Sequence, residues 1–423
     1  MGAVAYLTLT ATILTLLSAA STVAVATGST TYGGTVPAPS GVTLHSVCGD
    51  SSRGLLFAVG TDGTRGMIYR IDSLTSGGYV RLVERSPPPG WGYQLSFYAC
   101  EVVDDYIFVS GEVRSDKAVR GVFLVYSVSG VELNVKLTGV GIGRVQFRDI
   151  DVKKVGSYYY VYALSVVDDS IEYYYTYFDG SKFAGISGVQ IGTGVGYGVS
   201  IYGSYLGLLW RDSAGNLKLE VYDISGGSPN YVRTVTVLTG FTGVRAAEAA
   251  YSDGFIVAVA GMVYRVTYGT WGVEEFVAVG DVPECNPYAV LTAEKNGAKA
   301  AYIFSQVGAP PDMMVCVVAV DLASRRVAYA DTILGLEQSM EGFGDAYVVW
   351  VDPSTGDVVV PEYPDSRSYM VYTTVAGTSS SLIYYDLTRG GVLPYPVPEP
   401  WFVSLAVLAS TATAVALIVR RAG

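Results

Sequence analysis

The chain has 423 residues, a net charge of −11 and 50% apolar residues, but only 15% charged residues. These values exclude an intrinsically disordered chain, a collagen-like chain and a small disulfide scaffold. The acidic balance also excludes a nucleic-acid binder that depends on bulk positive charge. His45 is the single histidine, which excludes most Ser-His-Asp, Cys-His and multi-histidine metal chemistry.

The N-terminal region carries an apolar segment. No charged side chain precedes Asp50, and residues 3–26 are almost continuously apolar or hydroxylated. Residues 24–26 (AVA) have the small-x-small pattern of a signal-peptide cleavage site. No Lys or Arg precedes the run, so an uncleaved membrane helix is the alternative. We predict a signal peptide or an N-terminal membrane helix at 1–26, followed by a linker or closing strand at 27–41.

The region 42–390 consists of short runs rich in Val, Ile, Tyr and Leu, separated by Gly, Asp and Ser, which is typical of an all-β domain. Four predicted strands in a unit of about 45–52 residues are the repeat of a β-propeller. We therefore predict an all-β fold with a seven-bladed β-propeller. Six or eight blades are alternatives, and two tandem β-sandwiches are the alternative architecture. The centres of the recurring apolar runs lie near Phe57, Phe108, Tyr160, Leu208, Val257, Ile303 and Val348.

The C-terminal region carries a second apolar segment. Residues 401–419 contain no charge, and this length is sufficient to span a bilayer as a helix. Two arginines follow at once, and the positive-inside rule keeps them in the cytoplasm. We predict a Pro-rich linker at 391–400, a transmembrane helix at 401–419 and a cytoplasmic tail at 420–423. The chain is then a single-pass protein of the cell membrane, with its bulk outside the cell. A buried C-terminal helix is the alternative.

The residues that flank the C-terminal segment resemble a known sorting signal. Val397-Pro398-Glu399-Pro400 precede the apolar run, and Arg420-Arg421 follow it. This arrangement resembles the PEP-type signals of exosortase and archaeosortase substrates, which combine a short Pro-Glu-Pro motif, one helix and a basic tail. The resemblance covers residues 397–421 only. It implies that the helix is removed and the protein re-anchored, whereas a plain stop-transfer anchor is the alternative.

Four cysteines are an even number, which suggests disulfides in an exported protein. Cys48 and Cys100 lie at nearly matching distances before the centres of the first two apolar runs. We predict the pairs Cys48–Cys100 and Cys285–Cys316, each of which would add about 2–4 kcal/mol. No C-x-x-C spacing occurs, so zinc is disfavoured.

The binding face of a propeller is formed by the joints between blades and by the loops between the second and third strands. We expect a catalytic motif, a metal site and a resident cofactor to be absent. Acidic turns such as 104–105, 168–169, 212–216 and 352–357 leave calcium as an alternative to ordinary turn chemistry. The charged residues that fall on the expected face are candidates for binding, with solvated loop charges as the alternative: Asp62, Arg65, Arg144, Arg211, Asp212, Arg245, Glu248, Asp312 and Glu337.

These observations together predict an exported cell-surface β-propeller that binds a protein or glycan partner or builds the envelope. No nucleic-acid partner is expected. The alternative is an extracellular hydrolase or lyase of polysaccharide, which needs two carboxylates within about 5–10 Å of each other. The dense tyrosines are expected to pack on half-exposed strands and could also stack on sugars. Only five Asn and five Gln occur, which suggests a thermophilic, archaeal-like source.

Overall fold

The computed structural model describes most of the region between residues 32 and 386. The predicted segments 1–26, 391–400, 401–419 and 420–423 lie outside it. Within the described part, no helix combines the length and the hydropathy that a membrane span requires. The described ranges are 32–138, 145–167, 170–243, 245–251, 253–278, 286–295, 298–308, 313–336, 339–340, 347–352, 354–360, 367–376 and 379–386.

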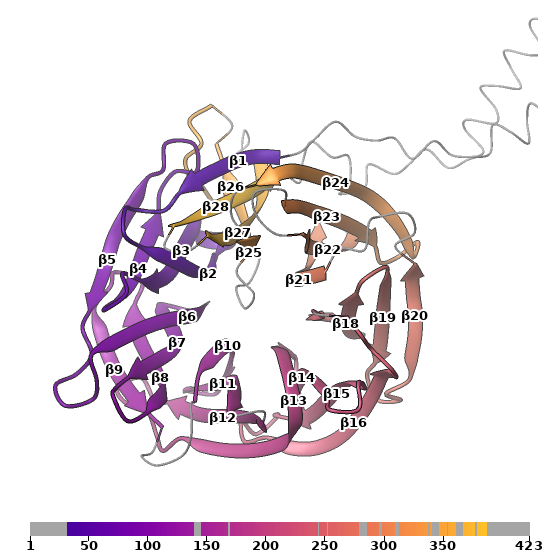
Figure 1. The fold of residues 1–423 in the computed structure, drawn as a ribbon, viewed down its shortest axis with the longest axis horizontal. Helices are drawn as coiled ribbons and strands as arrows, with labels where there is room; N and C mark the ends of the chain where they lie inside the picture. The colour runs from indigo at the N-terminus through magenta and orange to yellow at the C-terminus, as the bar shows by residue number, and fades with distance from the viewer. Residues whose placement is uncertain are drawn as a thin grey trace, which may run out of the picture.

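Antiparallel sheets stand side by side in a ring around one axis (Figure 1). In each four-stranded sheet, the first strand lies nearest the axis and the following strands lie progressively further out. The four-stranded sheets are β2 (Thr43–Asp50), β3 (Leu55–Thr61), β4 (Gly66–Ile71), β5 (Tyr79–Arg85); β6 (Gln94–Val103), β7 (Tyr106–Arg114), β8 (Val119–Ser127), β9 (Glu132–Leu137); β17 (Ala247–Tyr251), β18 (Gly254–Val259), β19 (Met262–Thr267), β20 (Val273–Ala278); and β21 (Asn286–Lys295), β22 (Ala298–Val307), β23 (Met313–Asp321), β24 (Arg326–Leu336).

One sheet has seven strands because β13 (Ser187–Tyr202) belongs to two units. Its first half pairs with β12, and its second half, from Gly194 onward, pairs with β14. Gly194 has φ +146°, and a Cβ at this position would lie 1.9 Å from the carbonyl oxygen of Arg211. Only glycine fits at this position, where β13 passes from one unit to the next. The other strands of the sheet are β10 (Phe147–Val155), β11 (Tyr158–Val167), β12 (Ser170–Phe178), β14 (Tyr205–Asp212), β15 (Leu217–Asp223) and β16 (Asn230–Leu238).

The ring is closed by strands from both ends of the described chain. β1 (Tyr32–Pro37) pairs with β28 (Ser379–Asp386), which pairs with β27 (Arg367–Ala376). β25 (Ser339–Met340) and β26 (Tyr347–Val351) both pair with β27 on its other side. β1 therefore lies at the outer edge of this five-stranded closing sheet. The region 27–41, expected to be a linker or a closing strand, thus contributes a strand to the last sheet.

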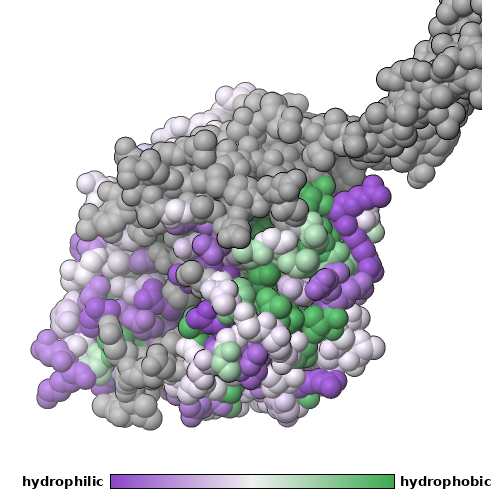
Figure 2. Space-filling model, turned by 45° about the vertical axis from the view of Figure 1, so that its right-hand side comes forward, coloured by the Kyte–Doolittle hydropathy of each residue, from purple (hydrophilic) through white to green (hydrophobic). Residues whose placement is uncertain are grey.

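The apolar core consists of layers between neighbouring sheets. Phe57 and Ile68 of one sheet pack with Phe97 and Val109 of the next, and all four side chains are buried. Because each sheet is covered on both faces, a strand such as β3 is buried along almost its whole length. Several tyrosines are fully buried in these layers. On the described part of the face shown in Figure 2, hydrophobic residues form a patch right of centre, with hydrophilic residues to its left and right.

The ring of antiparallel sheets confirms the prediction of an all-β fold of the propeller type. Two tandem sandwiches would instead stack their sheets in separate pairs. The disulfide Cys48–Cys100 is also confirmed. It joins the inner strands β2 and β6 of adjacent sheets, with 5.7 Å between the two Cα atoms. Cys316 in β23 is disulfide-bonded as well, and Cys285 lies outside the described residues.

Five inner strands share an irregularity at the same place. The pairing of each inner strand with its neighbour shifts by one residue in the N-terminal half of the inner strand, which in β13 is the part from Gly194 onward, and the shift leaves one extra residue in the inner strand. A β-bulge of this kind re-aims the side chain of the extra residue. We call these extra residues the bulge residues: His45, Tyr98, Arg148, Tyr197 and Tyr288.

Candidate functional site

Asp62 and Arg65, two of the predicted binding residues, shape the turn between β3 and β4. Asp62 Oδ1 accepts hydrogen bonds from the backbone N–H groups of Thr64 (2.9 Å) and Arg65 (2.7 Å). The Arg65 guanidinium pairs with Asp62 Oδ2 at 2.5 Å and also with Glu84. Burial raises the pKa of Asp62, but these hydrogen bonds and the charge of Arg65 lower it overall. Both charges are therefore committed to the turn and to the neighbouring strand.

Asp212, another predicted residue, closes the turn between β14 and β15 in the same way. Its Oδ1 accepts from the backbone N–H of Asn216 (2.8 Å), and its Oδ2 pairs with Lys218 Nζ (2.8 Å). The hydrogen bond from Lys218 is the largest influence on the Asp212 carboxyl and lowers its pKa. Arg211 donates to the carbonyl oxygen of Gly243 at 2.9 Å.

Arg245 lies just before β17, and its guanidinium carbon is 4.9 Å from the ring centre of Tyr288. Burial raises the pKa of Tyr197, while the charges of Arg211 and Arg245 oppose that rise. The structure therefore brings two of the predicted arginines close to one bulge residue. It does not describe the Glu248 side chain, and the remaining candidates lie outside the described residues: Arg144, Asp312 and Glu337.

A buried polar cluster lies at the same end of the inner strands, and sequence analysis missed it. The side chain of Glu112, in β7, is 0% exposed. Arg114 Nη2 donates to Glu112 Oε1 at 2.7 Å, and Gln146 Nε2 donates to Oε2. A carboxylate with two such donors can be buried because both of its oxygens have partners.

Three bulge residues extend this cluster through contacts with Gln146 and with one another. The His45 ring lies 4.9 Å from the Tyr98 ring, and the Arg148 guanidinium carbon lies 3.9 Å from the same Tyr98 ring. The Arg148 side chain also donates twice to Gln146 Oε1, at 3.1 and 3.3 Å. Burial raises the pKa of Tyr98 to about 12. We call the full set the axial cluster: Glu112, Arg114, Gln146, His45, Tyr98 and Arg148.

The axial cluster is the candidate functional site because it unites side chains from three neighbouring sheets at the inner wall of the ring. β2 contributes His45, β6 contributes Tyr98 and β10 contributes Arg148, and these are the strands nearest the axis (Figure 1). The only signal in the sequence is positional. Each bulge residue lies about 10–15 residues before the centre of an apolar run.

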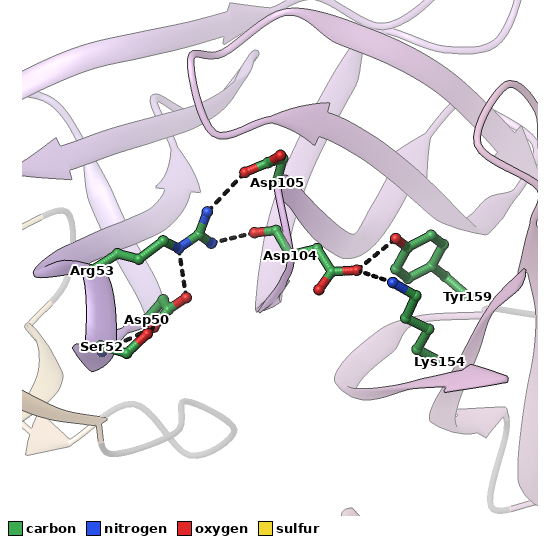
Figure 3. A network of polar contacts seen from close by, with 7 residues as sticks. All are labelled: Asp50, Ser52, Arg53, Asp104, Asp105, Lys154 and Tyr159. Atoms are coloured by element: carbon green, nitrogen blue, oxygen red, sulfur yellow. Dashed lines mark hydrogen bonds and ion pairs between the residues drawn. The ribbon is translucent and has the colours of Figure 1, made fainter. Parts of the chain in front are cut away.

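A second polar network lies at the opposite, C-terminal ends of the same inner strands (Figure 3). Arg53, in η1 (Ser51–Arg53), binds the Asp50 carboxylate at 2.6 Å and the Asp105 carboxylate at 2.8 Å. It also donates to the carbonyl oxygen of Asp104. One guanidinium therefore joins the β2–β3 turn to the β6–β7 turn of the next sheet.

Asp104 continues this network to a third sheet (Figure 3). Its Oδ2 accepts from Lys154 Nζ at 2.6 Å and from the Tyr159 hydroxyl at 2.7 Å. These two hydrogen bonds lower the pKa of Asp104. Hydrogen bonds and the charge of Arg53 likewise lower the pKa of Asp50, against the opposing effect of burial. A cavity of about 560 Å³ adjoins this network and is lined by Asp50, Arg53, Asp104, Asp105, Tyr106 and Tyr159.

The carboxylates of this cavity are better suited to joining neighbouring sheets through ion pairs than to acid–base chemistry. A glycosidase needs one carboxyl group with a raised pKa to act as a general acid. Asp50 and Asp104 have lowered pKa values instead, and all three acidic residues that line the cavity have cationic partners. Among the described residues, no group of three or more His, Cys, Asp or Glu is placed to hold a metal ion.

Comparison with known proteins identifies no family. No family model matches the chain, and no curated protein matches it. Similar solved structures include the WD40 β-propeller domain of Doa1 (11% identity, TM-score 0.48, covering 85% of this chain and 99% of that chain). The WD40 domain of SCAP from fission yeast has 8% identity and a TM-score of 0.47, and covers 84% of this chain and 98% of that chain. The Pseudomonas aeruginosa periplasmic gluconolactonase PpgL has 15% identity and a TM-score of 0.46, and covers 69% and 86% respectively.

Proposed function

We propose that this chain is an exported, seven-bladed β-propeller that is held at the cell surface and binds a macromolecule or builds the envelope there. The four single sheets, the two halves of the seven-stranded sheet and the closing sheet are the seven blades of this proposal. The helix predicted at 401–419 is the proposed anchor, and the segment at 1–26 is the proposed export signal. The PEP-type resemblance at 397–421 offers a second route of attachment.

The Cys48–Cys100 disulfide is the observation that carries the export part of the proposal. Both cysteines are buried, at 3% and 1% exposure, between the inner strands of two sheets. Disulfides form and persist in oxidising compartments and are rare in the cytosol, except in hyperthermophiles, so the apolar segments at both ends are needed beside the disulfide to argue for export. A buried structural disulfide in a chain that also has an apolar segment at each end is therefore best explained by export.

The chemistry of the described sites supports binding over catalysis. The axial cluster offers a guanidinium held on an aromatic ring, beside a carboxylate that is already paired. Such a group recognises a ligand by charge and shape, without a proton transfer. The carboxylates of the second network have lowered pKa values. The polysaccharide hydrolase is therefore the less favoured alternative.

Protease treatment of intact cells tests the placement. Proteinase K added outside should digest the bulk of the full-length chain, while a cytoplasmic marker protein survives. As a matched control, a chain lacking residues 1–26 should be protected in intact cells. It should also carry reduced Cys48 and Cys100 when alkylated without reductant and analysed by mass spectrometry. Protection of the full-length chain in intact cells, with digestion after lysis, would overturn the proposal.

A further inference from the structure

We propose that the bulge residues around the ring axis form a binding site for saccharides that carry carboxylate groups. This inference rests on the proposed binding function and names the chemical class of the ligand. It concerns the axial cluster and its continuation on the units that follow β10–β12 around the ring: Tyr197, Arg211, Arg245 and Tyr288.

The same bulge recurs in several inner strands. A bulge disrupts the hydrogen-bonded ladder of a strand and is often found next to functional sites, where it re-aims a side chain. Here it recurs in the N-terminal half of five inner strands, where the inner part of β13 begins at Gly194. The extra residue is in every case a ring or a guanidinium and never a small residue. Tyr197 belongs to an apolar layer between sheets, but the other four bulge residues do not, so core packing does not explain their selection.

The guanidinium groups of this region are held in place. Arg148 rests on the Tyr98 ring at 3.9 Å, and the Gln146 amide oxygen accepts two hydrogen bonds from it. Further round the ring, Arg245 rests on the Tyr288 ring at 4.9 Å. An ordered guanidinium loses little conformational entropy when it binds a carboxylate, so its affinity is higher than that of a mobile side chain.

One buried hydroxyl group, that of Tyr197, has no hydrogen-bond partner among the described residues. Tyr197 is 7% exposed. The charges of Arg211 and Arg245 act on the same hydroxyl. A buried hydroxyl without a partner costs free energy, which a ligand oxygen at this position would recover.

The combination of side chains selects an acidic saccharide. The guanidinium fork matches a carboxylate in geometry and charge. Tyr98 and Tyr197 are buried, but His45 and Tyr288 are partly exposed. The electron-rich faces of these two rings attract the C–H groups that a sugar ring presents. Arg148 lies in β10 and Arg245 just before β17, the inner strand of a sheet further round the ring. In this proposal a chain of uronic acid units, which repeats its carboxylate at intervals, engages both arginines.

Isothermal titration calorimetry on the full-length chain in mild detergent tests the proposal, with tetragalacturonate as the probe. We expect saturable binding that weakens as NaCl is raised, because the contacts are ionic. R148Q and R245Q should each weaken binding by about tenfold to a hundredfold, the effect of losing a hydrogen bond to a charged group. Y288L should also weaken binding, since it keeps the apolar volume but removes the ring.

The matched control is R70Q, which removes the same charge from an arginine of β4 that pairs with Asp72. It should bind tetragalacturonate like the unmodified chain, and thermal melts should show that every variant is folded. Equal binding of the fully methyl-esterified tetrasaccharide would overturn the role of the carboxylate. Equal binding of tetraglutamate would overturn the choice of a saccharide. Absence of binding to the folded chain would overturn the site itself, whereas the protease experiment on cells would be unaffected.

Discussion

Removal of the Cys48–Cys100 disulfide should destabilise the propeller by an amount that its loop length sets. The two cysteines are separated by 52 residues in the sequence. In the chain-entropy model, a cross-link over a loop of this length lowers the entropy of the unfolded chain by about 14 cal/mol/K. At 25 °C this corresponds to about 4 kcal/mol of stability. That is a large part of the total of about 5–15 kcal/mol that is usual for a folded domain.

The test is urea unfolding of the full-length chain and of the double variant C48A/C100A, followed by tryptophan fluorescence. The variant should lose about 4 kcal/mol under oxidising conditions. In the presence of a reductant that opens the disulfides of both proteins, the two unfolding curves should differ by less than about 1 kcal/mol, because neither chain then carries the cross-link. Equal stability of the oxidised proteins would refute the reasoning, as would a difference of the same size after reduction.

Three further predictions concern packing and charge. The variant G194A should lose more than about 3 kcal/mol in urea unfolding, since its Cβ would meet a carbonyl oxygen at 1.9 Å, whereas G185A, with open space around it, should be nearly neutral. The variant E112A should lose about 2–3 kcal/mol of unfolding free energy, because Arg114 and Gln146 lose their shared acceptor. A loss below about 0.5 kcal/mol would contradict the pairing of the buried Glu112 carboxylate. Asp104 has a lowered pKa, so its contribution to stability is complete above the unfolded pKa of about 3.9 and is lost as the pH falls through the folded value. The variant D104N should therefore show a smaller loss of melting temperature on acidification than the unmodified chain.

The regular spacing of the apolar runs predicted the ring, because each run is a strand that its unit must bury. The first six run centres, from Phe57 to Ile303, all fall in the second strand of a unit. That strand is covered on both faces and therefore reads as a continuous apolar run. The last centre, Val348, falls instead in β26, which lies on the inner side of β27. The irregular last unit reflects closure by β1, a strand supplied from the other end of the chain.

The candidate site was harder to predict because it depends on register. A bulge is defined by how a strand pairs with its neighbour, and the residues themselves do not reveal it. Arg148 looks like any charged strand residue until the pairing shift between Phe147 and Asp149 is known. Conversely, Asp62 and Arg65 stand out in the sequence, but their charges are used within a turn.

The pairing of β1 with β28 also determines how the molecule responds to pulling. Tyr32 faces Tyr385, so the two described ends of the chain leave the closing sheet from the same end of an antiparallel pair. A force that drew these ends apart would break the backbone hydrogen bonds between the two strands one after another, starting at this end, rather than all at once. A force applied through only one of the two ends would not pull β1 away from β28 in this way.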